Sequence, residues 1–200
     1  IIFYMDAPAI REELRDMARR LATSGYYVML PNLYYRSGVM ELGPIPPDPE
    51  APERKAMFGY MNSINIPMVM EDTAALLAWA EKQPAANTGI IGTVGYCMSG
   101  RYAINAATHF PVKAAASIYG THLATDQPDS PHLAGQKTKA ELYFACAETD
   151  IYAPQEIIDK VAAGVKGANA EVEIYPGTHH GFAFPKRPVY HRDAAERHWE

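Results

Sequence analysis

A cysteine with glycines on both sides is the first place where residue type and spacing suggest catalysis. Cys97 lies between Gly95 and Gly100, after the apolar run 90–94 and before residues 101–107, which are typical of a helix. A nucleophile in a sharp turn between a strand and a helix needs neighbours with little side chain. The N-terminus of the following helix favours negative charge on the sulfur. The segment therefore predicts a nucleophile elbow in which Cys replaces Ser.

A structural cysteine could have the same local sequence, so the interpretation depends on a base and an acid elsewhere. In α/β-hydrolases the order along the chain is nucleophile, acid, histidine. Cys97, Asp150 and His180 follow this order, and each comes directly after a predicted strand. Because ligands bind at the carboxyl ends of parallel strands, the three side chains are expected to meet there. We predict that they form a catalytic triad.

Neighbouring residues compete for two of these roles. Glu148 could be the acid, although Asp150 is better placed in the turn between strand and helix, where it could also serve only as a helix cap. His179 competes with His180, which is followed by a glycine that leaves room for the imidazole. Cys146 lies within a predicted strand and is interpreted as an inert core residue. The remaining histidines are expected to be surface or packing residues: His109, His122, His132, His191 and His198.

Apolar strands alternate with helices along the chain. Strands are expected at 1–5, 26–30, 87–94, 112–119, 140–147 and 170–175, and helices at 10–24, 65–83, 98–109, 154–165 and from 193. This alternation predicts an α/β fold, a mainly parallel sheet covered by helices on both faces, in a single domain over residues 1–200. The proline-rich stretch 36–64 is expected to be a loop that borders the site. Both termini look truncated, because the chain starts in a strand and stops in a helix.

Composition narrows the classes of function. The net charge is -5, with 48% hydrophobic and 20% charged residues, which is ordinary for a soluble globular protein and gives no electrostatic reason to expect nucleic acid or a membrane as partner. No apolar run approaches the ~20 residues that a membrane span needs. The two cysteines form no disulfide framework or zinc pattern. We expect a cytoplasmic protein without metal or cofactor.

Four segments resemble the dienelactone hydrolase family. They are residues 31–36, 95–100, 148–154 and 175–182, with the sequences PNLYYR, GYCMSG, ETDIYAP and YPGTHHGF. The resemblance covers nearly the whole chain, and the Cys elbow distinguishes it from most α/β-hydrolases, which use Ser. It implies the α/β-hydrolase fold and the triad Cys97, Asp150 and His180.

The resemblance also implies roles around the triad. The backbone N–H groups of Met98 and Ala7 would form the oxyanion hole, and Arg36 would help to hold a substrate carboxylate. Asp6 stands where family members often carry Glu, and Phe184 stands where a second basic residue is expected. The pocket is therefore expected to be less cationic and more apolar than in members that cleave dienelactone. The residues expected to contact substrate are Asp6, Arg36, Tyr119 and Phe184.

The function that these residues predict is hydrolysis of small activated esters or enol lactones through an acyl-enzyme on Cys97. The partner would be a small-molecule substrate, and the protein a monomer or small homo-oligomer. The alternative is a binding protein on the same fold, against which an intact set of three catalytic residues argues. A redox-sensing thiol would need a resolving cysteine, for which Cys146 is poorly placed.

Overall fold

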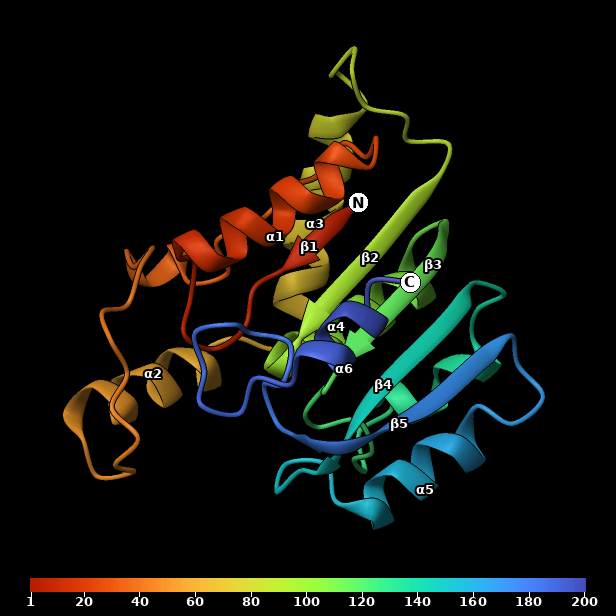
Figure 1. The fold of residues 1–200 in the computed structure, drawn as a ribbon. Coiled ribbons are helices and arrows are strands. Elements are labelled where there is room, and N and C mark those ends of the chain that lie inside the picture. Colours follow the sequence, from red (N-terminus) through yellow and green to blue (C-terminus); the bar gives the residue numbers. More distant parts are fainter.

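Five parallel strands form one sheet in the order β1-β2-β3-β4-β5 in the computed structural model, which describes residues 1–200. The strands are β1 (Ile2–Tyr4), β2 (Ile91–Tyr96), β3 (Val112–Ile118), β4 (Glu141–Thr149) and β5 (Ala170–His179). The register places Gly95 of β2 beside Tyr4 of β1 and Ser117 of β3. Because all strands run the same way, their carboxyl ends share one edge of the sheet, as Figure 1 shows.

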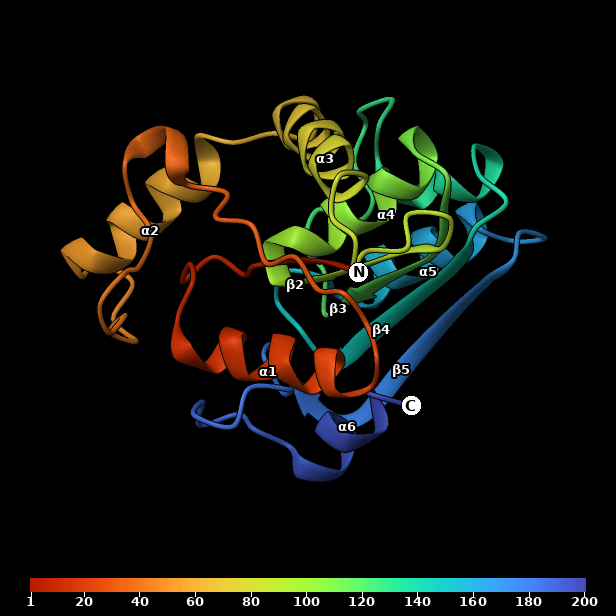
Figure 2. The ribbon, with the colours of Figure 1, turned by 90° about the horizontal axis from the view of Figure 1, so that it is seen from above.

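Helices cover both faces of this sheet. In Figure 2, α1 (Glu12–Thr23) and α6 (Arg192–Arg197) lie on one side, and α3 (Ile66–Ala80), α4 (Gly100–His109) and α5 (Gln155–Gly164) lie on the other. This arrangement confirms the predicted α/β fold. Burial of apolar side chains on both faces explains why the strands are nearly continuous runs of apolar residues. The hydroxyl groups of Tyr4 and Thr73 lie 2.7 Å apart and join β1 to α3.

The strand expected at 26–30 is reduced to a single bridge. Met29 pairs with Ile2 at the free edge of β1, and two backbone hydrogen bonds of 2.8 and 2.9 Å hold it there, from Phe3 to Met29 and from Met29 to Ile1. The ladder stops because Pro31 follows and has no N–H to continue it.

The stretch 36–64 contains a helix where we expected only a loop. Its second half forms α2 (Pro52–Asn62), with proline at the first helical position, where the missing N–H removes no hydrogen bond. This helix stands apart from the two helical layers, beyond the carboxyl ends of β1 and β2 (Figures 1 and 2). Tyr60 of α2 packs against Tyr34 with ring centroids 5.7 Å apart, so α2 contacts a residue that borders the predicted oxyanion hole.

The C-terminal part differs from the prediction at two points. β5 continues through Pro176 and Gly177 to His179, where a turn was expected. A proline is tolerated because β5 is an edge strand. The last helix is also shorter than expected, because α6 ends at Arg197 rather than continuing to residue 200.

Candidate active site

The predicted nucleophile elbow is a strained turn directly after β2. Cys97 has a φ of 57°, in the left-handed region that non-glycine residues rarely adopt. A 3₁₀ turn over Cys97–Ser99 leads into α4. A side chain at Gly95 would collide with the backbone carbonyl of Ser99, so this position must be glycine for the turn to close.

The other side of the turn is built differently from the expectation of a glycine on each side. The residue two positions after Cys97 is Ser99, which is fully buried and donates its hydroxyl hydrogen to the carbonyl oxygen of Met5. This bond ties the elbow to the end of β1. Gly100 serves another purpose, because a side chain there would collide with Ser117 and Gly120. It allows α4 to lie close against β3.

The structure brings Asp150 and His180 together at the carboxyl edge of the sheet. Nδ1 of His180 lies 2.7 Å from Oδ2 of Asp150, whose other oxygen accepts the Tyr152 N–H at 2.9 Å. The carboxylate is buried, so Nδ1 carries the proton of this bond. Nε2 is also buried and has no well-formed hydrogen bond. It is therefore available to a thiol proton from Cys97.

Electrostatics couple Cys97 to His180. Burial alone would raise the pKa of the thiol, but the charge of the nearby His180 opposes it, and the pKa is lowered. Burial would likewise lower the pKa of His180, whereas the charge of Cys97 and the bond to Asp150 raise it to about 9. The opposite shifts favour transfer of the proton from sulfur to Nε2. A thiolate beside an imidazolium is the form in which a cysteine acts as a nucleophile, and both shifts are in its direction.

The residues that could have taken the place of Asp150, His180 or Cys97 lie in other environments. Glu148 accepts the N–H of Gly177 at 2.8 Å instead of bonding to His180. His179 points to solvent at the end of β5. Cys146 is buried in β4, and burial raises the pKa of its thiol to about 12, which keeps it protonated and unreactive.

The two residues predicted to supply the oxyanion hole are held by one side chain that the sequence analysis did not single out. Ala7 is buried after β1, and its N–H donates to no carbonyl oxygen of the chain. The hydroxyl of Tyr34 donates to the carbonyl oxygen of Ala7 at 3.0 Å and lies 3.4 Å from Sδ of Met98. The only signal in the sequence was that Tyr34 belongs to the segment 31–36.

Asp6 is fully buried and carries two ion pairs. Arg11 binds its two oxygens at 2.5 and 3.2 Å, and Arg187 binds one of them at 2.7 Å. The ring of Phe184 lies 4.7 Å from one guanidinium and 4.8 Å from the other. The prediction of a less cationic pocket considered only position 184. Phe184 replaces one basic residue, but two arginines from other parts of the chain pack against its ring.

Arg36 lies outside this group. Its guanidinium bonds to both oxygens of Asp72 on α3, at 2.7 and 2.8 Å, and stacks on the ring of Tyr35. None of its hydrogen bonds reaches Cys97 or His180. The structure does not bring it together with the triad as it does Asp6, whose charge acts on Cys97.

An aromatic cluster packs behind the triad. Tyr119 follows β3, and its ring centroid lies 5.2 Å from that of His180, 5.2 Å from Phe182 and 6.0 Å from Phe184. Tyr96, the residue before the nucleophile, joins the same cluster and bonds through its hydroxyl to Nε2 of His198, 2.9 Å away. His198 was expected to be a surface or packing residue. It packs in this cluster and connects α6 to the predicted elbow.

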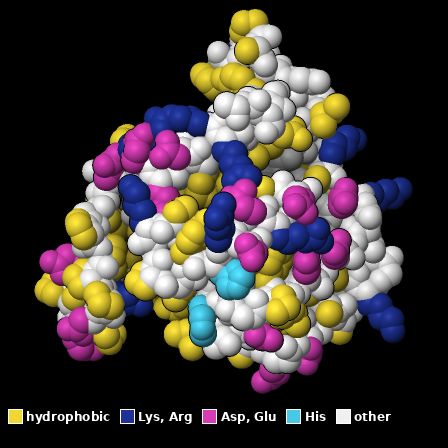
Figure 3. Space-filling model, in the orientation of Figure 1, with side chains coloured by type: hydrophobic (Ala, Val, Ile, Leu, Met, Phe, Trp, Pro, Cys, Tyr) yellow, Lys and Arg dark blue, Asp and Glu magenta, His cyan; other side chains and the backbone are white.

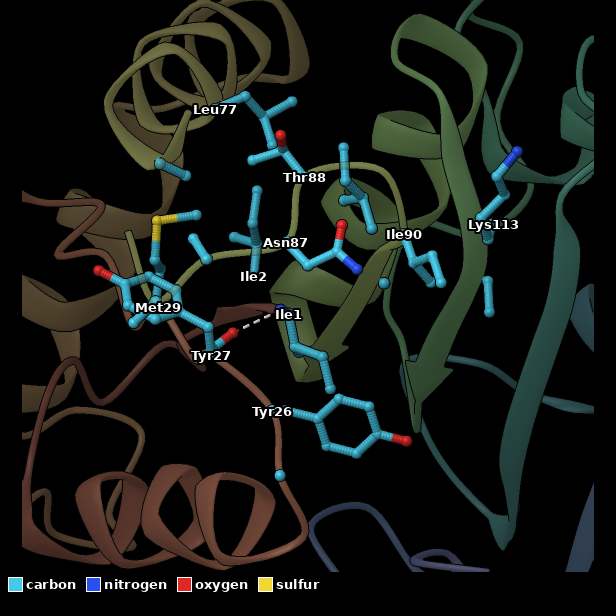
Figure 4. A pocket seen from close by; sticks show the side chains of 17 residues that line it. Ile1, Ile2, Tyr26, Tyr27, Met29, Leu77, Asn87, Thr88, Ile90 and Lys113 are labelled. Carbon is cyan, nitrogen blue, oxygen red and sulfur yellow. Dashed lines mark hydrogen bonds between the residues drawn. The ribbon is translucent and has the colours of Figure 1, made fainter. Parts of the chain in front are cut away.

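A pocket lies at the opposite edge of the sheet. It encloses about 440 Å³ beside Ile1, Ile91 and Lys113, at the amino ends of the strands (Figure 4). No cysteine, histidine or carboxylate lines it, so the pocket is separate from the triad. No group of three or more His, Cys, Asp or Glu side chains is placed to hold a metal ion.

Figure 3 shows the charged side chains on one face of the molecule. On the face in Figure 3, acidic and basic side chains are interspersed, without a broad patch of a single sign. None of the helices has the length and apolar character that crossing a membrane would require.

Comparison with known proteins identifies the family. The model of the dienelactone hydrolase family matches residues 1–200. An Escherichia coli K12 protein named "Putative carboxymethylenebutenolidase" is 28% identical over 206 residues, which cover 100% of this chain and 73% of that protein. A Synechocystis protein of the same name is 27% identical over 207 residues, covering 100% and 82%. The crystal structure named "Putative Dienelactone Hydrolase" from Klebsiella pneumoniae superposes with a TM-score of 0.83 at 25% identity, over 99% of this chain and 82% of that one. The chain belongs to the dienelactone hydrolase family and is a hydrolase of the kind that acts on esters and lactones.

Proposed function

We propose that this protein hydrolyses small activated esters or enol lactones through a covalent acyl-enzyme on Cys97. The observation that carries the proposal is the state of His180. One of its nitrogens is fixed by Asp150 at 2.7 Å, and the other is buried without a well-formed bond beside a thiol whose pKa it lowers. A histidine held in this way can take a proton from the nucleophile and return it later.

Acylation begins when the Cys97 sulfur attacks the carbonyl carbon. The carbonyl oxygen becomes an anion, which the N–H groups of Met98 and Ala7 would stabilise; one such donor is typically worth about 2.7–4 kcal/mol. The C–O bond to the leaving group then breaks, and the leaving oxygen takes the proton that His180 received from the thiol. In deacylation, His180 removes a proton from water, which attacks the thioester and frees Cys97.

The substrate class follows from the nucleophile. Thiolates expel activated oxygen leaving groups readily, and amides poorly unless the nitrogen is strongly protonated, so esters and lactones are favoured over peptides. The names of the two relatives suggest a butenolide lactone as one candidate. A substrate carboxylate could bind Arg36 if it displaces Asp72, or Arg187 if it competes with Asp6. Binding by Arg36 is tested with a screen of small esters and lactones with and without a carboxylate, run on Arg36→Ala and on the parent protein.

The decisive experiment replaces the nucleophile. Cys97→Ala should abolish hydrolysis of p-nitrophenyl acetate and labelling by iodoacetamide at pH 7. Cys146→Ala is the matched control, because it removes the other buried thiol, and it should keep both activities. Mass spectrometry of the quenched reaction should detect the acyl group on the peptide that contains Cys97. Full activity of Cys97→Ala would overturn the proposal and favour a binding protein on the same fold.

A thiol nucleophile must stay reduced to act, so we place the protein in the cytoplasm as part of the same proposal. We also retain the prediction of a monomer or small homo-oligomer, since the proposed triad needs no residue from a second chain. Sedimentation of the purified protein measures the oligomeric state directly.

A further inference from the structure

The hydroxyl group of Tyr119 is buried and has no partner. The side chain is completely enclosed, and four buried side-chain polar atoms in the whole chain lack a hydrogen bond: Arg101 Nε, Ser117 Oγ, Tyr119 OH and His180 Nε2. A buried polar atom without a partner destabilises the folded state, so such atoms are rare and call for an explanation. One of the other three is the catalytic nitrogen of His180, whose ring touches that of Tyr119.

The backbone holds Tyr119 in place at a further cost. Its φ is 36°, a left-handed value that is unfavourable for a residue with a large side chain. A 2.7 Å hydrogen bond from its N–H to the carbonyl oxygen of Ala145 anchors the residue to β4. The aromatic rings of Tyr96, Phe182 and Phe184 fix the ring. Strain of this kind is found where a side chain has to be aimed at a site.

The Tyr119 hydroxyl lies close enough to the predicted site for the charges there to act on it. The charges of Arg187, Asp6 and Cys97 all act on the Tyr119 hydroxyl, and the first two also act on the sulfur. The ring meets that of His180 edge to face, with the centroids 5.2 Å apart, so Tyr119 lies beside the residue proposed to give its proton to the leaving group. Burial raises the pKa of Tyr119 well above its usual value, so the hydroxyl keeps its hydrogen at every working pH and can donate it in a hydrogen bond.

We propose that Tyr119 is a catalytic residue whose hydroxyl donates a hydrogen bond to the leaving-group oxygen of the ester. The inference rests on the proposed function and adds one group to it. As the bond between the acyl carbon and this oxygen breaks, negative charge grows on the oxygen. The proton that neutralises it comes from the imidazolium of His180, which received it from the Cys97 thiol. Tyr119 keeps its own hydrogen throughout and stabilises the charge until that transfer is complete.

The test varies the leaving group. Tyr119→Phe keeps the ring and removes only the hydroxyl, and its kcat/KM is measured on acetate esters whose leaving groups range from p-nitrophenol to ethanol. Because kcat/KM depends only on the steps up to the first irreversible one, it measures the rate of acylation. A poor leaving group carries more charge when the bond breaks. The ethyl ester should therefore lose about tenfold or more and the p-nitrophenyl ester less than about twofold.

Tyr96→Phe is the matched control. It removes the hydroxyl of a neighbouring ring in the same cluster, but that hydroxyl already has a partner in His198. Any loss that it causes should be the same for all leaving groups. An equal loss across the series in Tyr119→Phe would overturn the inference and leave Tyr119 as a packing residue.

A second variant covers the case in which Tyr119→Phe fails to fold. Fluorotyrosine placed at position 119 has a more acidic hydroxyl, which makes it a stronger hydrogen-bond donor while its size barely changes. Hydrolysis of the ethyl ester should then become faster relative to the p-nitrophenyl ester, and an unchanged ratio would count against the inference. Failure of the proposed function itself gives a different result, because ester hydrolysis would then survive in Cys97→Ala.

Discussion

Two histidines flank the same aromatic cluster, and their chemistry is opposite. His180 bonds to the buried carboxylate of Asp150, and its pKa is raised to about 9 although burial alone would lower it. His198 meets the hydroxyl of Tyr96 at 2.9 Å, and burial lowers its pKa to about 4. Both rings lie against aromatic side chains, so burial acts on each in the same direction. The difference lies in the charge of the partners.

The two partners select different forms of the imidazole. A carboxylate and a nearby thiolate stabilise the imidazolium. A neutral hydroxyl does not offset the cost of burying that charge. His198 bonds through Nδ1 to the carbonyl oxygen of Ala195, so its Nε2 has a lone pair that accepts the hydrogen of Tyr96. One histidine is thus prepared for proton transfer, and the other is a neutral link between α6 and the elbow.

The largest expected effect is the loss of catalysis at one histidine and not at the other. His180→Gln should lower kcat/KM for p-nitrophenyl acetate by about 10²–10⁴, because the proton acceptor is removed. His198→Gln is the matched control and should stay within a few-fold of the parent protein, since His198 contacts the residue before the nucleophile and not the thiol. Steady-state kinetics at pH 7 measures both. Equal losses in the two variants would mean that the histidines share a structural role.

The next largest expected effect is the dependence of the free energy of unfolding on pH, to which His198 should contribute. The pKa of His198 is lowered from 6.5 in the unfolded chain to about 4, so only the unfolded chain takes up this proton as the pH falls through that range. The free energy of unfolding should therefore decrease from pH 6.5 to pH 4, with about 3 kcal/mol of the decrease due to His198. Urea denaturation at several pH values measures it, and His198→Gln should flatten this limb.

His180 should contribute little in the same experiment. Its raised pKa favours folding at low pH, and this stabilisation is lost as the pH rises from 6.5 to about 9. The lowered pKa of Cys97 acts in the opposite direction, because its stabilising contribution grows over the range below pH 9. A proton that only moves from sulfur to nitrogen changes the proton count of the folded state little. A steep decrease in stability between pH 6.5 and 9 would show that the two groups are not coupled.

The same contrast explains how much could be predicted from the sequence. The α/β fold and the approach of Asp150 to His180 follow from alternating elements and from residues at strand ends, which parallel topology brings to one edge. The Tyr96–His198 link could not be predicted in this way, since it joins positions 102 residues apart through the packing of a short helix. The pairing of Arg11 and Arg187 with Asp6 was missed for the same reason. Long side chains reach a site from loops, and the periodicity of a sequence does not predict where the end of such a side chain lies.

The smallest expected effect belongs to the hydrogen bond between Tyr96 and His198. Tyr96→Phe removes the donor and leaves Nε2 of His198 without a partner, so the free energy of unfolding should fall by about 1–2 kcal/mol. His198→Phe removes the acceptor and should cost a similar amount. The double variant leaves neither polar group unpaired, and it should lose less than the sum of the single variants by about 1 kcal/mol or more. Urea denaturation at pH 7 supplies all four values. Strict additivity would mean that the bond stabilises nothing, and α6 would then be held to the elbow by aromatic packing alone.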